Sequence, residues 1–142
     1  LITGGARRLG RVMAERFANA GYDIALHYFS SEEDALSLQQ DLREKGKVCE
    51  LFQADLRNAE EIPILVEEVH QALPHCNLLI NNASTFQRVS FRETTPEYFD
   101  ETLAINFKAP FFLTQAFASL MKQGAVINML DVAIETNRIR YF

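Results

Sequence analysis

A glycine turn between a strand and a helix opens the sequence, and it constrains the fold more than any other feature. Residues 1–10 read Leu-Ile-Thr-Gly-Gly-Ala-Arg-Arg-Leu-Gly. Apolar residues follow at helical spacing, namely Leu9, Val12, Met13 and Phe17. A glycine turn before a helix offers backbone N–H groups at the positive helix end, which suits a phosphate. A purely structural turn is the alternative, but the adjacent cations Arg7 and Arg8 favour an anion in the gap.

Strand and helix patterns alternate along the rest of the chain. Mostly apolar runs predict strands over residues 22–28, 48–52, 77–82 and 125–130, in addition to the strand that ends at Ile2. Helical patterns cover residues 8–20, 30–45 and 58–73, and the last helix runs from Thr95 to a break at Gly124. This alternation predicts right-handed crossovers and a doubly wound parallel sheet of about five strands, in a three-layer α/β/α fold.

Helix starts and buried helix faces can also be predicted. Ser30 with Glu33, and Asn58 with Glu61, have the spacing of capping boxes. Pro96 follows Thr95 at a first helical position. Two apolar stripes are expected to face the sheet, one made of Ala35, Leu38 and Leu42 and the other of Ile62, Leu65, Val66, Val69 and Leu73.

Composition excludes several classes of protein. The chain has 142 residues, 48% of them hydrophobic and 23% charged, which is typical of one soluble globular domain. The net charge of −5 and the scattered basic residues argue against a nucleic-acid partner. No apolar run approaches ~18 residues and no signal peptide is present, so a cytoplasmic protein without a membrane partner is expected. Cys49 and Cys76 lack metal-ligand spacing and are expected to be buried thiols, with no metal site.

Several motifs together resemble the short-chain dehydrogenase/reductase family over the whole chain. Residues 3–10 match the family's T-G-x-x-x-G-x-G motif, except that Arg8 replaces the middle glycine. This exchange, with Asn-Asn-Ala-Ser at residues 81–84, is similar to the pteridine reductase subgroup, which includes dihydromonapterin reductases. His27-Tyr28, Ser84-Thr85-Phe86 and the Ile-Asn-Met-Leu-Asp run at residues 127–131 strengthen that likeness. The resemblance implies a Rossmann-like dinucleotide-binding fold.

The charge pattern after the second strand favours NADP(H) over NAD(H). Dinucleotide folds that prefer NAD carry an acidic residue ~20 positions past the glycine turn, where it binds the ribose 2′-hydroxyl. Counting from Gly10 arrives at Ser30, and residues 27–31 contain no acid. A 2′-phosphate is therefore expected near Arg7, Ser30 and Ser31. Ser30 can serve as a helix cap at the same time.

The resemblance also implies which residues bind the cofactor. Asp55 is expected at the adenine edge, with a solvated loop acid as the alternative, and Asn82 is expected to steady the turn at the end of the fourth strand. The expected cofactor-binding residues are Thr3, Gly4, Arg7, Arg8, Leu9, Gly10, His27, Tyr28, Ser30, Ser31, Asp55, Leu56, Asn82, Ala83 and Ser84.

Substrate and catalytic residues are implied in the same way. Phe86 is expected to stack on a pterin ring, although an ordinary core phenylalanine is the alternative. Ser84 and Arg8 are expected to bind the substrate as well. Asn106 is expected to be a buried amide that holds a water in a proton relay. Asp131 replaces the family's usual serine and could pass a proton to a ring nitrogen. A loop-capping acid is the alternative for Asp131.

The family's Y-x-x-x-K pair is not found in the sequence. Tyr141 is followed only by Phe142, so we interpret it as a less constrained residue that precedes the catalytic tyrosine. Residues 1–142 are therefore expected to be an incomplete NADP-binding domain, inactive by itself and with an open sheet edge. The full-length protein is expected to be a homo-oligomer, a dimer or a tetramer.

Three functions are consistent with these observations. The leading hypothesis is an NADPH-dependent reductase of a pterin, dihydropteridine or dihydrofolate-like substrate, with hydride transfer to a C=N bond. The first alternative is a reductase of a sugar, steroid or acyl ketone. The second is a non-catalytic NADP-binding module, which the absence of the Tyr–Lys pair would permit.

Overall fold

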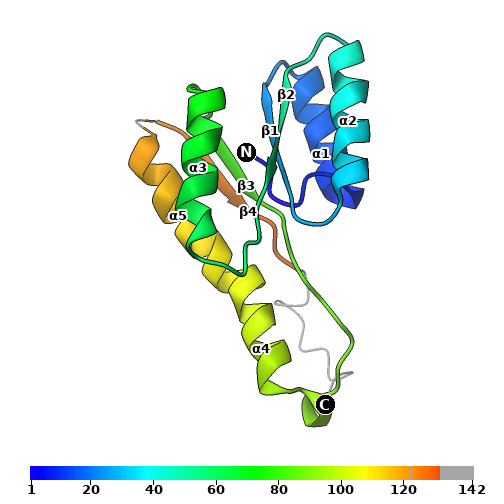
Figure 1. Ribbon diagram of the computed structural model, residues 1–142, viewed down its shortest axis with the longest axis vertical. Coiled ribbons are helices and arrows are strands. Elements are labelled where there is room, and N and C mark those ends of the chain that lie inside the picture. Colours follow the sequence, from blue (N-terminus) through cyan, green and yellow to red (C-terminus); the bar gives the residue numbers. More distant parts are fainter. Residues whose placement is uncertain (122, 132–142) are drawn as a thin grey trace.

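A parallel sheet forms the centre of the molecule (Figure 1). The computed structural model describes residues 1–121 and 123–131. Strand β1 (Ile24–Tyr28) pairs with β2 (Cys49–Gln53), and β3 (Leu78–Asn81) pairs with β4 (Ala125–Asn128). Ile2 lies between the two pairs and bridges to both Leu26 and Ile80 in the parallel sense. The order across the sheet is thus β2, β1, the short strand at Ile2, β3 and β4, which confirms the doubly wound parallel fold.

Helices cover both faces of this sheet. Helices α1 (Arg8–Asn19) and α2 (Glu32–Glu44) pack on one face, and α3 (Glu61–Ala72) and α5 (Ala109–Leu120) pack on the other (Figure 1). A short 3₁₀ turn, η1 (Phe91–Glu93), precedes α4 (Pro96–Leu103). Between α4 and α5 lies a π-helical turn, η2 (Ala104–Lys108), so that the three segments form one rod. The single long helix expected here therefore contains a π turn.

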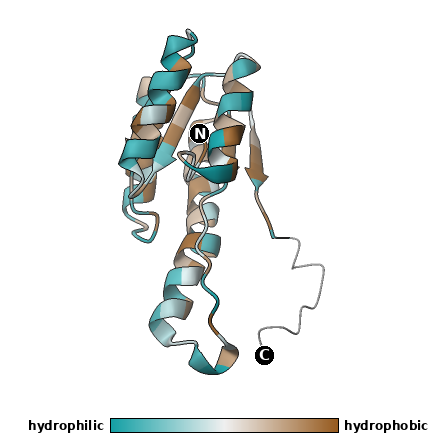
Figure 2. Ribbon diagram, turned by 90° about the vertical axis from the view of Figure 1, so that its right-hand side faces the viewer, coloured by the Kyte–Doolittle hydropathy of each residue, from teal (hydrophilic) through white to brown (hydrophobic). Residues whose placement is uncertain are grey.

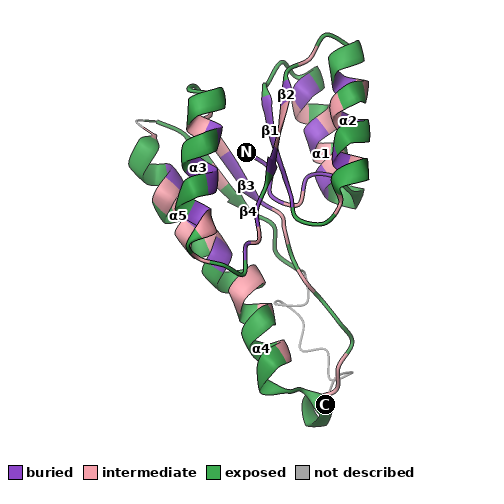
Figure 3. Cartoon of the chain, viewed as in Figure 1, coloured by how far each residue is buried: buried purple, intermediate pink, exposed green. Residues whose placement is uncertain are grey.

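Two apolar layers fill the space between the sheet and the helices. Strand β1 is buried along its whole length and contributes Ala25 to the α3/α5 layer and Leu26 to the α1/α2 layer. Figure 2 shows hydrophobic residues concentrated in the strands and hydrophilic residues on the outer helices. The apolar stripes predicted for α2 and α3 are buried, except that Leu73 is half-buried at the end of α3. Helix α4, in contrast, has no buried residue (Figure 3).

Helix α1 packs through small residues and through part of its apolar set, since Met13 and Phe17 are partly buried against the same core cluster. Gly10, Ala14 and Ala18 are buried, whereas Leu9 and Val12 are about half exposed. A Cβ atom on Gly10 would lie 2.3 Å from the Gly4 carbonyl oxygen. The start of the helix therefore sits too close to the turn for any side chain at Gly10.

Two of the predicted helix starts are wrong and one is confirmed. Helix α2 begins one residue later than expected, after Ser31, and no serine side chain caps it. The Asn58–Glu61 pair does not make the reciprocal bonds of a capping box. The Glu61 carboxylate accepts hydrogen bonds from the Asp55 N–H at 2.7 Å and from the Asn58 side-chain amide at 3.1 Å, and the Asn58 amide oxygen accepts one from the Glu60 N–H at 3.1 Å. Thr95 does cap α4, since its hydroxyl oxygen accepts a hydrogen bond from the Tyr98 N–H at 3.3 Å.

The last strand and the two cysteines differ in part from what the sequence predicts. The last strand ends at Asn128, two residues earlier than predicted. Cys49 is buried, and this burial raises the pKa of its thiol to about 11, whereas Cys76 is only half-buried. Within residues 1–121 and 123–131, no helix is both long and apolar enough to cross a membrane. Tyr141 lies outside the residues that the structure describes.

Candidate functional site

The glycine turn lies at the carboxyl end of the short first strand and is tied to the end of β3. The buried Thr3 hydroxyl oxygen accepts hydrogen bonds from the N–H groups of Asn82 at 2.9 Å and Ala83 at 3.0 Å. In return, the Asn82 amide donates to the carbonyl oxygens of Thr3 at 2.9 Å and Gly4 at 3.1 Å. This reciprocal network fixes the turn at the point where the connections leave the central strand in opposite directions, which is where open α/β sheets bind ligands.

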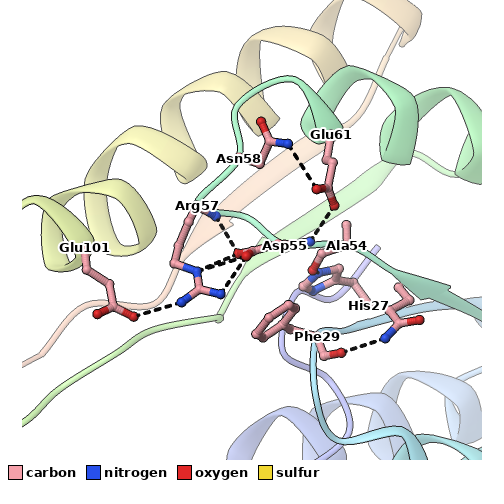
Figure 4. Close-up of polar contacts among 9 residues, drawn as sticks. His27, Phe29, Ala54, Asp55, Arg57, Asn58, Glu61 and Glu101 are labelled. Atoms are coloured by element: carbon pink, nitrogen blue, oxygen red, sulfur yellow. Dashed lines mark hydrogen bonds and ion pairs between the residues drawn. The ribbon is translucent and has the colours of Figure 1, made fainter.

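The end of β1 holds the other side of the turn through His27. The buried imidazole accepts a hydrogen bond from the Gly4 N–H at Nδ1, 3.1 Å away. Its Nε2 lies 3.1 Å from the Ala54 carbonyl oxygen, and Figure 4 shows these two residues side by side. These partners require a neutral ring with its proton on Nε2. Burial lowers the pKa of His27, which favours the same neutral form.

The contacts of His27 limit which N–H groups of the turn can receive an anion. The Gly4 N–H is bonded to the His27 ring and the Gly5 N–H to the His27 carbonyl oxygen, so neither faces a ligand. The first-turn N–H groups of α1, among them those of Leu9 and Gly10, have no partner within the helix. The N–H groups that are available to an anion therefore lie at the start of α1.

Arg8 occupies an unusual backbone conformation at this helix start. Its φ is +48°, in the left-handed region that glycine adopts without a Cβ penalty. A non-glycine residue there costs about 1–2 kcal/mol. The chain thus keeps a conformation suited to glycine at Arg8, whose side chain is exposed at the start of α1.

Arg7 is also exposed, and its partner is an acid that the sequence analysis did not consider. Its Nε lies 2.5 Å from a carboxylate oxygen of Asp34, in the first turn of α2. Ser30 is exposed and Ser31 half-buried in the loop just before α2. Arg7 and these serines therefore lie on adjoining segments, but Asp34 partly neutralises the cation. Its position three residues after Ser31, on the first turn of a helix, is the signal that could have identified it.

The Asp55 carboxylate is engaged by a second arginine that the sequence analysis missed. Arg57 donates to it from Nε at 2.9 Å, from Nη2 at 2.6 Å and from its backbone N–H at 3.0 Å (Figure 4). The side-chain hydrogen bonds from Arg57 hold the pKa of Asp55 below its ordinary value. The same guanidinium lies 4.9 Å from the centre of the Phe29 ring and 3.3 Å from Glu101. Leu56, between the two partners, is buried.

Ser84 and Phe86 follow the end of β3, and Asn106 lies beside them. Ser84 is exposed, and Phe86 exposes 71% of its surface, so Phe86 is not a core residue in the described chain. Asn106 is exposed, and the expectation of a buried amide is wrong. Its amide oxygen accepts a hydrogen bond from the Thr85 N–H, and its amide nitrogen donates to the Thr85 carbonyl oxygen, both at 2.9 Å. The π turn η2 carries Asn106 to the rod face next to this segment.

Asp131 leaves the sheet at the same edge as Ser84. Asn81 of β3 is in register with Asn128 of β4, and their side chains are linked by a hydrogen bond of 2.8 Å. Ser84 and Asp131 each come three residues after this pair, so both segments start from one edge of the parallel sheet. Asp131 is exposed. Among the described residues, no group of three His, Cys, Asp or Glu side chains could hold a metal ion.

Comparison with known proteins agrees with this geometry. A probable galactose dehydrogenase of Rhizobium meliloti, GalD, is 30% identical over 140 residues, which cover 96% of this chain and 55% of that protein. The chain thus spans about half the length of the curated relatives it matches.

Solved structures share the fold closely. A short chain dehydrogenase from Burkholderia cenocepacia, crystallised with NADP, matches with a TM-score of 0.92 and 28% identity, over 96% of this chain and 56% of that one. FolM alternative dihydrofolate reductase 1 from Brucella canis, also with NADP, matches with a TM-score of 0.88 and 27% identity, over 94% of this chain and 54% of that one.

The sequence profile of one protein family extends over almost the whole chain. It is described as short chain dehydrogenase, and it matches residues 1–140. The doubly wound sheet and the glycine turn after its first strand are consistent with this match. The chain therefore belongs to the short chain dehydrogenase family.

Proposed function

We propose that this chain is the cofactor-binding part of an NADPH-dependent reductase that acts at a C=N bond of a pterin-like ring, either a dihydropteridine or a dihydrofolate-like compound. One observation carries the proposal. The glycine turn, the exposed Phe86 ring after β3 and Asp131 after β4 all lie on chain segments that leave the same edge of the sheet. A cofactor turn, a flat apolar surface and an acid would hold a hydride donor, stack on a flat ring and supply a proton, which together suit reduction of a pterin-like ring.

The residues of the turn fit a dinucleotide. Gly10 has no side chain where a Cβ would meet the Gly4 carbonyl oxygen at 2.3 Å and the Asn82 amide at 2.9 Å, so the helix start and the turn can approach closely. We assign Thr3, Gly4, Arg8, Leu9 and Gly10 to the diphosphate and its turn. When bound, the nicotinamide supplies the hydride.

The ribose phosphate and the adenine are assigned to the neighbouring strand ends. Arg7, Ser30 and Ser31 would receive the 2′-phosphate, with the backbone of His27 and Tyr28 beside them. Asp55 and Leu56 would contact the adenine, and Asn82, Ala83 and Ser84 would line the part of the cofactor that approaches the substrate. The structures with NADP among the family members support this choice of cofactor.

On the substrate side, Phe86 would stack on the pterin ring, and Ser84 and Arg8 would contact its polar edge. Asp131 would hold a proton and pass it to the ring nitrogen that becomes basic during reduction. Asn106 would act through a water near Thr85, with which it already shares two hydrogen bonds. The likeness to FolM alternative dihydrofolate reductase 1 supports a pterin-like ring.

A carbonyl substrate is the second candidate. The probable galactose dehydrogenase GalD is 30% identical to this chain and the Brucella canis FolM is 27% identical. GalD therefore supports a sugar substrate as strongly as FolM supports a pterin-like one. The two proposals share the cofactor and differ in the roles of Phe86 and Asp131. A cytoplasmic location and a homo-oligomeric full-length protein belong to both proposals.

Steady-state kinetics of the purified full-length protein would test the function. With NADPH, we expect kcat/KM for a dihydropterin to exceed that for galactose oxidation with NADP and for reduction of a simple diketone by at least a hundredfold. Comparable values for the diketone, or turnover of galactose alone, would favour the carbonyl enzyme and overturn the pterin proposal.

A further inference from the structure

We propose that Tyr98 is a positioning residue for substrate, which, together with Asn106, holds the backbone on both sides of Phe86 so that the ring forms a fixed platform for a flat heterocycle. The inference rests on the proposed function, because the platform has a purpose only if a ring stacks on Phe86. It concerns α4, which carries Tyr98, and η2, which carries Asn106.

Two side chains of the rod bind two alternate residues of the segment that follows β3. The Tyr98 hydroxyl accepts a hydrogen bond from the Gln87 N–H at 3.1 Å and donates to the Gln87 carbonyl oxygen at 3.0 Å. Asn106 contacts both backbone groups of Thr85 in the same manner, at 2.9 Å each. Each side chain thus satisfies the donor and the acceptor of one residue, as a neighbouring strand would.

The residue between the two contacts is Phe86. Because hydrogen bonds hold the backbone at Thr85 and at Gln87, they restrain the peptide units on both sides of Phe86. The ring nevertheless exposes 71% of its surface. A large aromatic side chain on a doubly anchored backbone is a pre-organised contact surface, since the ordering cost is met in folding and not on binding.

Tyr98 is itself anchored where α4 begins. Its N–H donates to the Thr95 hydroxyl oxygen at 3.3 Å, and its carbonyl oxygen accepts a hydrogen bond from the Thr102 hydroxyl at 2.8 Å. The side chain is half-buried, unlike most of its neighbours on α4. The hydroxyl group therefore extends from a capped first helical turn, which makes it a rigid support.

The variant Tyr98→Phe removes only the hydroxyl and tests the inference in the full-length protein. We expect the affinity for a non-reducible pterin to fall about tenfold and the KM for the dihydropterin to rise about tenfold. The NADPH affinity and the KM for a small diketone are expected to stay unchanged. Amide hydrogen exchange of peptides that cover residues 84–90 is expected to accelerate, while peptides from α5 keep their protection. Tyr22→Phe is the matched control, since Tyr22 is exposed and packs edge-on against Phe17 at the end of α1, 5.4 Å away.

Combination with Phe86→Ala separates this inference from the proposed function. On a Phe86→Ala background, Tyr98→Phe is expected to have no further effect on pterin affinity. Weaker pterin binding in Phe86→Ala but not in Tyr98→Phe would overturn the inference and leave the proposed function intact. Unchanged pterin binding in both variants would overturn the proposed function, and the inference with it. Unaltered exchange of residues 84–90 in Tyr98→Phe would also overturn the inference.

Discussion

The buried His27 ring accepts a hydrogen bond from the Gly4 N–H, 3.1 Å away, and so ties the end of β1 to the turn that leads into α1. The opposite ring nitrogen faces the Ala54 carbonyl oxygen just after β2. One neutral imidazole thus joins the turn, β1 and the end of β2. The contact between His27 and the turn therefore requires the neutral form of this side chain.

Stability should consequently fall as the pH drops below about 6.5, the ordinary pKa of histidine. Burial lowers the pKa of His27 in the folded protein, so at mildly acidic pH the unfolded chain binds a proton that the folded chain does not. The unfolded state then holds more protons, and lowering the pH favours unfolding. Urea denaturation at pH 7.5 and pH 5.0 would measure the difference.

The variant His27→Phe isolates that contribution. It leaves the Gly4 N–H and the Ala54 carbonyl oxygen without their partner, and we expect a loss of about 1–3 kcal/mol at pH 7.5. The drop in stability between pH 7.5 and pH 5.0 should become smaller than in the wild type. His75→Gln, at an exposed position, serves as the control. An undiminished pH dependence in His27→Phe would assign the effect to other groups.

A side chain at Gly10 should damage the cofactor turn. In Gly10→Ala the new Cβ would lie 2.3 Å from the Gly4 carbonyl oxygen, so the start of α1 must shift. We expect a loss of about 1–3 kcal/mol in stability and at least a tenfold weaker NADPH affinity. Gly46→Ala is the matched control, because its φ of +71° strains the backbone while nothing lies within 4 Å of the new Cβ. If Gly46→Ala weakened NADPH binding equally, general destabilisation would be the cause.

Cofactor preference should depend on the loop after β1. We expect the full-length protein to bind NADPH at least tenfold more tightly than NADH, a difference of about 1.4 kcal/mol. Ser30→Asp should reduce this preference because a carboxylate there repels the 2′-phosphate. Titration of both cofactors, with Ser37→Asp on the exposed face of α2 as control, measures the effect. Equal affinities in the unmodified protein would contradict the assignment.

Local patterns predicted the fold well, because each depends on neighbours in sequence. The glycine turn, the buried strand at β1 and the Thr95 cap are set by residues a few positions apart. The packing of α1 was not predictable in this way. The close approach of Gly10 to Gly4 determines which side of the helix faces the turn, and hydrophobic periodicity does not reveal this contact.

Motifs in the sequence predict candidate site residues, but they do not reveal which partners those residues contact. Asp55 was identified from its motif, yet its pairing with Arg57 and the link from Arg57 to Glu101 depend on how α4 meets the loop after β2. The exposure of Asn106 has a similar origin. An amide among apolar neighbours suggests burial, but the π turn carries it to the surface of the rod, where Thr85 supplies its partners.

The last prediction separates a pterin enzyme from a carbonyl enzyme through Asp131. A carboxyl group at the end of β4 is useful as a proton relay when the accepting atom is a basic ring nitrogen, whereas a ketone oxygen does not need it. Asp131→Ser, which restores the residue usual in the family, should therefore slow dihydropterin reduction by at least tenfold and leave diketone reduction within about twofold of the wild type. Phe86→Ala in parallel should weaken pterin binding by about 1–2 kcal/mol, because the stacking contact is lost. Ketone binding should change little, because a small ketone gains little from stacking. Glu93→Gln, an exposed acid of η1, is the control for loss of charge. If Asp131→Ser left the pterin turnover unchanged, the pterin proposal would be wrong and a carbonyl substrate would be favoured.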